Sequence, residues 1–256
     1  MRLKLHISPC PNDTFMFDAL VNGRIDTGSL RFEVEYHDIE ELNRGAGLGR
    51  ADISKISCAV LPAIAEHYVL LDSGAALGRG NGPLLVRRAG DTRPIRRVAV
   101  PGLHTTANAL MGKLFPEIEE RTPLLFSRIA AAVERGDFDA GVLIHEGRFV
   151  YRERELELVA DLGQLWEQRL PLPLGGIAAR RSLPDEVRHE AERLLRTSIE
   201  YAFTHPEASR TYIKQHAQEL DDKVIDAHIA LFVNGYSLSL GDEGRRAVEA
   251  LTGVIP

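Results

Sequence analysis

Apolar and polar residues follow two periods along this chain, one typical of strands and one typical of helices. Residues 3–7 alternate apolar and polar side chains, as a half-buried strand does. Phe15, Phe17 and Leu20 then recur at the spacing of one helical face. Because strand and helix patterns keep alternating with short connections, we predict an α/β protein with mostly parallel sheets and right-handed crossovers.

The remaining elements are predicted in the same way, strands from short apolar runs and helices from longer periodic segments. Further strands are expected at residues 30–36, 53–57, 69–71, 84–88, 98–100, 124–126, 140–144, 156–162 and 172–179. Helices are expected at residues 39–48, 58–67, 105–114, 129–135, 165–169, 184–204, 207–215, 221–234 and 242–251.

The polar loop at residues 8–14 connects the first strand to the first helix. Its two prolines restrict the backbone before any ligand arrives, and Asn12, Asp13 and Thr14 are all residues that cap helices. Open α/β sheets bind ligands where a strand runs into a helix N-terminus. The loop is therefore either a ligand site or a well-capped turn, and whether Cys10 contacts a ligand is left open.

Two glycine-containing segments divide the chain into two units. Residues 78–83 precede an apolar strand, and residues 172–179 form a strand that contains two glycines. We predict that the chain crosses between two lobes at these places, because they flank a self-contained β/α unit. Lobe one then comprises residues 1–86 and 175–256, and lobe two comprises residues 87–174. A cleft between lobes favours small-molecule binding, and strands at a hinge allow closure.

Composition and charge narrow the class of partner. The 256 residues carry a net charge of −6 and no basic run, so we expect no nucleic-acid partner. No apolar run approaches the roughly 20 residues of a membrane span, and the start of the chain lacks the pattern of a secretory signal. Cys10 and Cys58 have no metal-ligand spacing and are expected to be reduced thiols. These features predict a cytoplasmic protein with neither a membrane partner nor a metal.

Polar residues at the ends of three strands are candidates for ligand contact. Lys55-Ile56-Ser57 precedes a helix, where its serine would also serve as an N-cap. Thr105 and Thr106 begin another helix, and their hydroxyl and N–H groups suit either an anion or simple capping. His145 follows the apolar strand at 140–144. Its imidazole would either accept a proton near pH 7 or serve as a hydrogen-bonded structural group.

Seven sequence blocks occur in an order that resembles one known family. They are SPCPNDTFMFDAL (8–20), DISKISCAVLP (52–62), GRGNGPLLV (78–86), PGLHTTANAL (101–110), GVLIHEGRF (141–149), LPLPLGGIAARR (170–181) and HIALFVNGYSLSLG (228–241). Together they are similar to the 1,4-dihydroxy-6-naphthoate synthases of the futalosine route to menaquinone. The resemblance extends over essentially the whole chain, and the SPCPNDTF and IHEGRF blocks are its most specific parts.

The resemblance implies a fold, a substrate and a reaction. The fold is that of type 2 periplasmic-binding proteins, and the enzyme is cytoplasmic and uses no cofactor. The substrate is cyclic dehypoxanthinyl futalosine, which is converted to 1,4-dihydroxy-6-naphthoate and dihydroxyacetone. A base removes a proton from a sugar hydroxyl, a carbon–carbon bond breaks in a retro-aldol sense, and aromatisation drives the reaction. Such chemistry requires a positioned base but neither a metal nor a nucleophile.

Residue by residue, the resemblance implies that His145 is the proton acceptor. It assigns substrate binding to Lys55-Ile56-Ser57 and to Thr105-Thr106, where a helix N-terminus suits the carboxylate of the substrate. Glu146 is the competing candidate for the base.

The opening loop supplies contacts that we infer ourselves. Asn12 and Asp13 are expected to hold the sugar hydroxyls of a small carboxylated substrate, and Ser8 is expected to contact the same substrate.

Two other functions remain as alternatives, and the oligomeric state is open. The first is the chorismate dehydratase of the same pathway and fold, which resembles this chain less. The second is a non-catalytic small-molecule binding module, which would bind its ligand without changing it. Both a monomer and a homodimer are compatible with the sequence.

Overall fold

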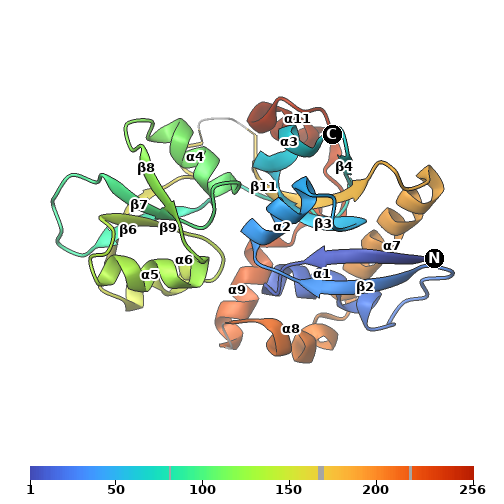
Figure 1. Cartoon of the computed structure of the whole chain (residues 1–256). Coiled ribbons are helices and arrows are strands. Elements are labelled where there is room, and N and C mark those ends of the chain that lie inside the picture. Colours follow the sequence, from blue (N-terminus) through green and yellow to red (C-terminus); the bar gives the residue numbers. More distant parts are fainter. Residues whose placement is uncertain (81, 167–169, 219–220) are drawn as a thin grey trace.

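The protein folds into two lobes, each built around its own β-sheet (Figure 1). The computed structural model describes residues 1–80, 82–166, 170–218 and 221–256. The six-stranded sheet of lobe one has the order β2-β1-β3-β11-β4, with β5 also paired to β11. The five-stranded sheet of lobe two has the order β10-β6-β9-β7-β8. The predicted α/β fold class is confirmed.

The strands of each sheet come from separate parts of the chain. The first sheet contains β1 (Arg2–Ile7), β2 (Arg31–Tyr36), β3 (Ile53–Ser57), β4 (Tyr68–Leu70), β5 (Ala76–Gly78) and β11 (Leu172–Arg180). The second contains β6 (Leu84–Arg88), β7 (Arg97–Val100), β8 (Glu120–Pro123), β9 (Ala140–Leu143) and β10 (Leu156–Asp161).

Helices surround both sheets, and most of those after β11 pack on lobe one (Figure 1). The α-helices are α1 (Pro11–Val21), α2 (Ile39–Gly47), α3 (Leu61–Ile64), α4 (Thr106–Leu114), α5 (Phe126–Glu134), α6 (Gly147–Val150), α7 (Asp185–Thr204), α8 (Arg210–His216), α9 (Asp222–Phe232), α10 (Gly235–Leu238) and α11 (Gly241–Thr252). Short 3₁₀ turns are η1 (Cys58–Val60), η2 (Tyr151–Glu153) and η3 (Pro206–Ser209). Within the described ranges, no helix has the length and apolar character needed to cross a membrane.

Both sheets are mixed, which corrects the expectation of mostly parallel sheets. β1 runs parallel to β2 and β3, whereas β11 runs antiparallel to β3, β4 and β5. In the second sheet β7 is parallel to its two neighbours, and β6 is antiparallel to β9 and β10. The antiparallel pairs involve β6 and β11, which the chain enters at its two passages between the lobes. Each of these strands is preceded in the chain by a strand of the other sheet (β5 before β6, β10 before β11), so no crossover within its own sheet constrains it to run parallel to its neighbours.

Membership of the two sheets shows where the chain passes from one lobe to the other, namely just before β6 and just before β11. β6 belongs to the second sheet from Leu84, and β11 belongs to the first sheet from Leu172. The lobe boundaries predicted at 86/87 and 174/175 therefore fall inside these strands. Of the helix predicted at 165–169, Leu165 and Trp166 are not helical, and residues 167–169 lie outside the described part of the chain.

Alternating side chains of the central strands build a core on both faces of each sheet. In β11, Ile177 and Ala179 belong to one apolar cluster and Ala178 belongs to another. In β7, Val98 and Ala99 divide in the same way. A strand that is buried on both faces reads as a continuous apolar run, which is how these strands appear in the sequence. Each sheet therefore has apolar clusters on both of its faces.

The first helix begins earlier than the sequence predicts. α1 starts at Pro11 with Cys10 at its N-cap, so that Asn12, Asp13 and Thr14 lie in the first helical turn. None of them caps the helix, which has no side-chain cap. Proline is well suited to the first helical position, because its φ is already helical and its missing N–H would have no intrahelical acceptor. The predicted loop at 8–14 is correspondingly shorter.

The sequence pattern predicts one strand at the wrong place, because it follows an apolar segment and not the polar edge strand beside it. The strand predicted at 124–126 is replaced by β8 at Glu120–Pro123, and Phe126 already begins α5. β8 lies at the edge of the second sheet, and its side chains are largely exposed. Such a strand has no apolar periodicity to detect, whereas the neighbouring apolar residues pack as the start of a helix.

Candidate functional site

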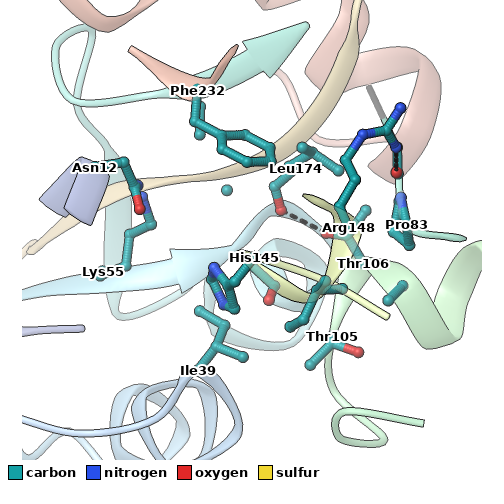
Figure 2. A pocket seen from close by; sticks show the side chains of 16 residues that line it. Asn12, Ile39, Lys55, Pro83, Thr105, Thr106, His145, Arg148, Leu174 and Phe232 are labelled. Atoms are coloured by element: carbon teal, nitrogen blue, oxygen red, sulfur yellow. Dashed lines mark hydrogen bonds between the residues drawn. The ribbon is translucent and has the colours of Figure 1, made fainter. Parts of the chain in front are cut away.

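A cavity of about 650 Å³ lies between the lobes and is lined by residues of both (Figure 2). The lining residues are Asn12, Ile39, Lys55, Ser57, Ala76, Gly82, Pro83, Thr105, Thr106, Ala107, Ile144, His145, Arg148, Leu174, Gly175 and Phe232.

Most of the side chains predicted to form the site meet in this cavity. Those that line it are Asn12, Lys55, Ser57, Thr105, Thr106 and His145. Ser8, Asp13 and Ile56 are not among the lining residues. The Ile56 side chain is fully buried in an apolar cluster of lobe one, because alternation along β3 turns it away from the face that carries Lys55 and Ser57.

Asp13 lies behind the lobe-one wall of the cavity and binds the side chains that form it. Its carboxylate is fully buried and accepts four hydrogen bonds. Oδ1 accepts from Lys55 Nζ and Asn12 Nδ2, each at 2.9 Å. Oδ2 accepts from Ser8 Oγ at 2.7 Å and from Ser8 N at 3.2 Å. A buried carboxylate is tolerated when it is paired and hydrogen-bonded in this way. Ser8 and Asp13 therefore hold Lys55 and Asn12 in place.

The two threonine hydroxyls already donate to backbone carbonyl groups. Thr105 Oγ1 donates to Gly102 O at 2.7 Å and accepts from Asn108 N at 3.2 Å, as an N-cap does. Thr106 Oγ1 donates to Leu174 O at 2.7 Å and accepts from Ala59 N at 3.3 Å. Thr106 consequently connects α4 of lobe two to two segments of lobe one.

The N-terminus of α4 still provides donors for an anion. The N–H groups of Thr106 and Ala107, in the first helical turn, have no intrahelical acceptor. Both residues line the cavity, and a helix N-terminus favours negative charge through its aligned peptide dipoles. An anion site at this place would therefore rest on backbone N–H groups more than on the hydroxyls that the sequence pattern brings to notice.

His145 lies in the cavity with an unusual backbone conformation. Among the described residues it is the one non-glycine residue with a positive φ, at 51°. This left-handed conformation is strained for most side chains and is enriched at functional sites. Phe126 contacts the imidazole edge-on, with ring centroids 5.0 Å apart. Figure 2 shows the ring between Asn12 and Lys55 on one side and Arg148 on the other.

The surroundings keep His145 neutral at pH 7. Burial lowers the pKa of His145 to about 4; the Asp13 carboxylate opposes this shift, and the Lys55 ammonium adds to it. The sequence pattern predicts a group that accepts a proton near pH 7, and burial moves the pKa of His145 below that range. The neutral imidazole is the form that accepts a proton, so the ring is ready to act as a base, although a weaker one than a solvated histidine.

His228 in α9 completes the wall behind His145, and sequence reasoning did not single it out. The two rings are stacked, with centroids 6.0 Å apart and planes 8° from parallel. His228 Nε2 lies 3.0 Å from Asn12 Oδ1, and because Asn12 Nδ2 donates to Asp13, this oxygen is the acceptor. His228 is fully buried, and burial lowers its pKa well below the ordinary value. The block HIALFVNGYSLSLG, which begins with this residue, was the available signal.

Arg148 adds a second positive charge at the opposite wall (Figure 2). Its guanidinium donates to Asp161 Oδ2 at 2.7 Å and to the backbone oxygens of Gly80 and Gly82. Sequence reasoning missed it, although it lies in the block that carries His145. The cavity therefore combines two cations, a helix N-terminus and the apolar side chains of residues such as Phe232, which suits a flat, carboxylated ligand.

Glu146, the competing candidate for the base, faces another space. It lines a neighbouring cavity with Phe126 and Tyr151 and is not among the residues that line the interlobe cavity. Its Oε2 lies 3.9 Å from His228 Nδ1. The placement of the two side chains favours His145 as the group that can contact a ligand.

Two named relatives are similar to this chain over nearly its whole length. A relative from Thermus thermophilus, named 1,4-dihydroxy-6-naphthoate synthase, is 46% identical over 253 residues, covering 97% of this chain and 92% of the relative. A relative of the same name from Streptomyces coelicolor is 42% identical over 257 residues, covering 97% of this chain and 91% of the relative. The resemblance inferred from the sequence blocks is confirmed.

Solved structures show the same architecture. A crystal structure of an Archaeoglobus fulgidus protein superposes with a TM-score of 0.93 at 34% identity, covering 98% of this chain and 95% of that one. The alkanesulfonate-binding protein SsuA of Xanthomonas axonopodis superposes with a TM-score of 0.73 at 13% identity, covering 97% and 90%. A Candida albicans protein with the periplasmic-binding-protein fold gives a TM-score of 0.72 at 14% identity, covering 100% and 92%. The last two likenesses concern the fold alone and confirm the predicted two-lobed binding-protein architecture.

A family model described as menaquinone biosynthesis matches residues 3–255, nearly the whole chain. With this match and two relatives above 40% identity, the chain belongs to the menaquinone biosynthesis family.

Proposed function

We propose that this protein is a 1,4-dihydroxy-6-naphthoate synthase, which cleaves cyclic dehypoxanthinyl futalosine to 1,4-dihydroxy-6-naphthoate and dihydroxyacetone. The names of the two relatives support this activity. The observation that carries the proposal is the neutral, strained His145 in a cavity that is also lined by Lys55, Arg148 and the N-terminus of α4. We further propose that the protein works in the cytoplasm without a cofactor; the free thiols of Cys10 and Cys58 suit a reducing compartment.

The proposed binding mode follows from the chemistry of the cavity walls. The aryl carboxylate accepts hydrogen bonds from the N–H groups of Thr106 and Ala107 at the start of α4. The rings of the substrate lie against Phe232 and other apolar side chains of the wall. The sugar remnant then lies toward Asn12 and Lys55, where amide and ammonium groups bind hydroxyl and carbonyl oxygens.

The proposed chemistry begins at the neutral imidazole of His145. The ring takes the proton of a sugar hydroxyl, and the electron pair of that O–H bond forms a carbonyl group as the adjacent carbon–carbon bond breaks. The electrons of the broken bond pass into the ring system that becomes aromatic. The imidazolium that results is favoured by the nearby Asp13 carboxylate, which raises the pKa of His145, and by the negative charge of the bound substrate.

Lys55 is proposed to stabilise the oxygen that gains charge as the bond breaks. Its ammonium is only 6% exposed and is held by Asp13 at 2.9 Å, so it need not reorganise during the reaction. Preorganised charge in a site with little water is an effective form of transition-state stabilisation.

The test is turnover of the purified protein with cyclic dehypoxanthinyl futalosine, followed by the fluorescence of the naphthoate product. We expect product from the wild type and far less from His145→Ala. Ligand that raises the melting temperature but is recovered unchanged would instead indicate a binding module. Conversion of chorismate to 3-enolpyruvoyl-benzoate would indicate the dehydratase.

A further inference from the structure

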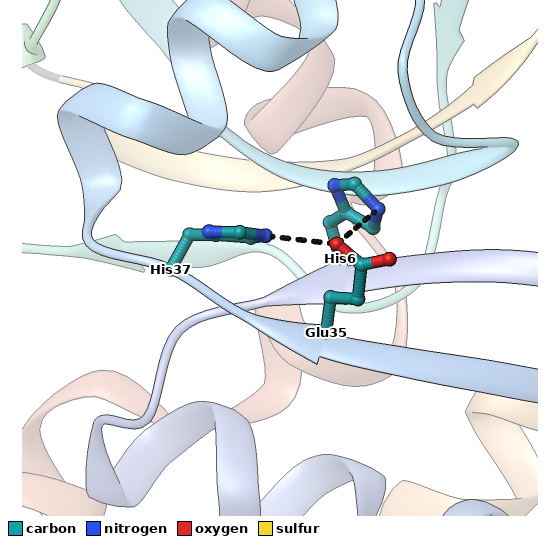
Figure 3. A group of neighbouring side chains, drawn as sticks. All are labelled: His6, Glu35 and His37. Atoms are coloured by element: carbon teal, nitrogen blue, oxygen red, sulfur yellow. Dashed lines mark hydrogen bonds and ion pairs between the residues drawn. The ribbon is translucent and has the colours of Figure 1, made fainter.

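A second group of chemically active side chains lies outside the interlobe cavity, on the sheet of lobe one. Figure 3 shows the imidazole rings of His6 and His37 turned toward the same carboxylate oxygen of Glu35. His6 Nε2 is 3.5 Å from Glu35 Oε2, and His37 Nε2 is 3.2 Å from that oxygen. The ligand atoms of the three residues all lie within 4.8 Å of one another.

The parallel pairing of β1 and β2 brings these residues together. His6 is the direct register partner of Glu35. His37 follows β2 two residues after Glu35 and continues the ladder by donating its N–H to Ile7 O at 3.1 Å. Because side chains alternate along a strand, Glu35 and His37 point to the same face of the sheet. The backbone thus presents two imidazoles and one carboxylate at one place.

One of the three ligand atoms is buried and makes no hydrogen bond within the described residues. His6 is 6% exposed, and within the described residues its Nε2 makes no hydrogen bond. The 3.5 Å distance to Glu35 is too long for one. Buried ring nitrogens are normally satisfied by a protein group or a bound ligand. His6 Nε2 instead faces the Glu35 oxygen that His37 also faces, so one ion could contact all three groups (Figure 3).

We propose that His6, Glu35 and His37 bind a Zn²⁺ ion, with water in the remaining position. Zinc is coordinated by imidazole nitrogen at about 2.0–2.1 Å and by carboxylate oxygen at about 2.0–2.2 Å, usually tetrahedrally. Two ligands of such an ion are therefore about 3.3–3.5 Å apart, close to the two measured distances of 3.2 and 3.5 Å. Three protein ligands with an open fourth position are a known zinc arrangement.

A second carboxylate lies near one of the ligands. Glu41 Oε2 lies 3.5 Å from Nδ1 of His37, the ring nitrogen that does not face Glu35. At this distance Glu41 can form an ion pair with His37 but no hydrogen bond, so it adds negative charge beside the proposed ion. The pair formed by His104 and Glu40 provides a contrast, since their 2.6 Å contact has no third ligand among the described residues.

The proposed ion would bind β1, β2 and the entry to α2 together. Ile39, two residues after His37, lines the interlobe cavity. The metal would therefore stabilise the wall of lobe one without contacting the substrate. This site is independent of the proposed activity, and its test does not depend on turnover.

The test measures metal binding directly. Protein without a histidine tag is stripped with a chelator and titrated with Zn²⁺ in a calorimeter, and its melting temperature is recorded. We expect one ion per chain and a higher melting temperature, because a ligand that binds only the folded state stabilises it. Titration with Co²⁺ should give the visible bands of a tetrahedral site without the near-ultraviolet absorption of a cobalt–thiolate bond.

Variants identify the ligands. His37→Gln and Glu35→Gln change partly exposed side chains and should weaken Zn²⁺ binding by at least about tenfold, since loss of even an outer-shell partner costs about 10–100-fold. His205→Gln, a surface histidine outside the group, should leave binding unchanged. His6→Gln should behave like His37→Gln if it folds. Absence of stoichiometric binding, or binding that survives both His37→Gln and Glu35→Gln, would overturn the proposal.

A further variant separates the proposed site from the group around His145. Cys10, His145 and Glu146 also place their ligand atoms within 4.8 Å of one another. Cys10→Ser should leave the affinity for Zn²⁺ and the Co²⁺ spectrum unchanged. Loss of binding in Cys10→Ser, or a thiolate band with Co²⁺, would place the metal there and refute the assignment to His6, Glu35 and His37.

Discussion

The ion pair between Asp13 and Lys55 provides the most demanding test of how this site is built. In Asp13→Asn the side chain keeps its shape but loses its charge, so that the buried Lys55 ammonium no longer has an anionic partner. The pair is only 2.9 Å apart, and the two residues are 0% and 6% exposed. Removing one partner of a buried pair typically costs about 3–5 kcal/mol. An amide at this position also cannot accept all four of the hydrogen bonds that the Asp13 carboxylate accepts.

This loss is large compared with the stability of a typical protein, about 5–15 kcal/mol. For a chain of this size, 1 kcal/mol corresponds to roughly 2–4 °C in the melting temperature. We therefore expect the melting temperature of Asp13→Asn to lie roughly 6–20 °C below that of the wild type. Circular dichroism measures the melting temperature, and urea unfolding measures the free energy of unfolding. Glu33→Gln is the matched control, because Glu33 pairs with Arg2 at the exposed surface. Its effect should stay within about 1 kcal/mol.

The double variant Asp13→Asn with Lys55→Met isolates the cause. It removes both charges and retains a long side chain in β3, so it should recover much of the stability lost in Asp13→Asn, since replacing a whole buried pair by apolar groups is often nearly neutral. Naphthoate formation should not recover, because Lys55 lines the cavity. The reasoning would be refuted if Asp13→Asn unfolded within about 1 kcal/mol of the wild type, or if the double variant were no more stable than the single one.

Three further predictions concern the cavity. His145→Ala should lower kcat by about 10²–10⁴-fold, the usual contribution of a general base, with little change in melting temperature; near wild-type turnover, or its abolition by Glu146→Gln, would identify another base. Because burial lowers the pKa of His145 to about 4 and that of His228 well below its ordinary value, the unfolded chain binds more protons than the folded one below about pH 6.5. Stability should thus be complete above about pH 6.5 and fall as the pH decreases toward 4, by up to about 3 kcal/mol for His145 alone. A flat profile of the urea midpoint between pH 7 and 4, or an equal slope in His228→Gln, would contradict this. Thr106→Val removes the contacts of its hydroxyl with Leu174 O and Ala59 N across the lobes, so substrate affinity, titrated on an inactive His145→Ala background, should weaken by about 1–3 kcal/mol. Unchanged affinity would show that these contacts between the lobes do not contribute to substrate binding.

Local sequence patterns were sufficient for much of the architecture. Strands buried on one or both faces, such as β1 and β11, were predicted because their apolar period reflects the pleat of the strand itself. The position of His145 after β9 and of Thr105 before α4 was predicted for the same reason, since a residue at the end of an element is located by that element. The family resemblance added roles for these residues that periodicity alone left undecided.

Tertiary structure decided which side chains meet and what their surroundings do to them. Asn12 and His228 are hydrogen-bonded across 216 residues of sequence, and no local pattern contains that contact. The direction of β6 and β11, the exclusion of Ile56 from the cavity and the lowered pKa of His145 likewise depend on what packs against each residue. The grouping of His6 with Glu35 and His37 depends on the register between two strands separated in the sequence. Short-range periodicity records the shape of an element, whereas strand register, burial and the proximity of charges exist only once the elements have packed.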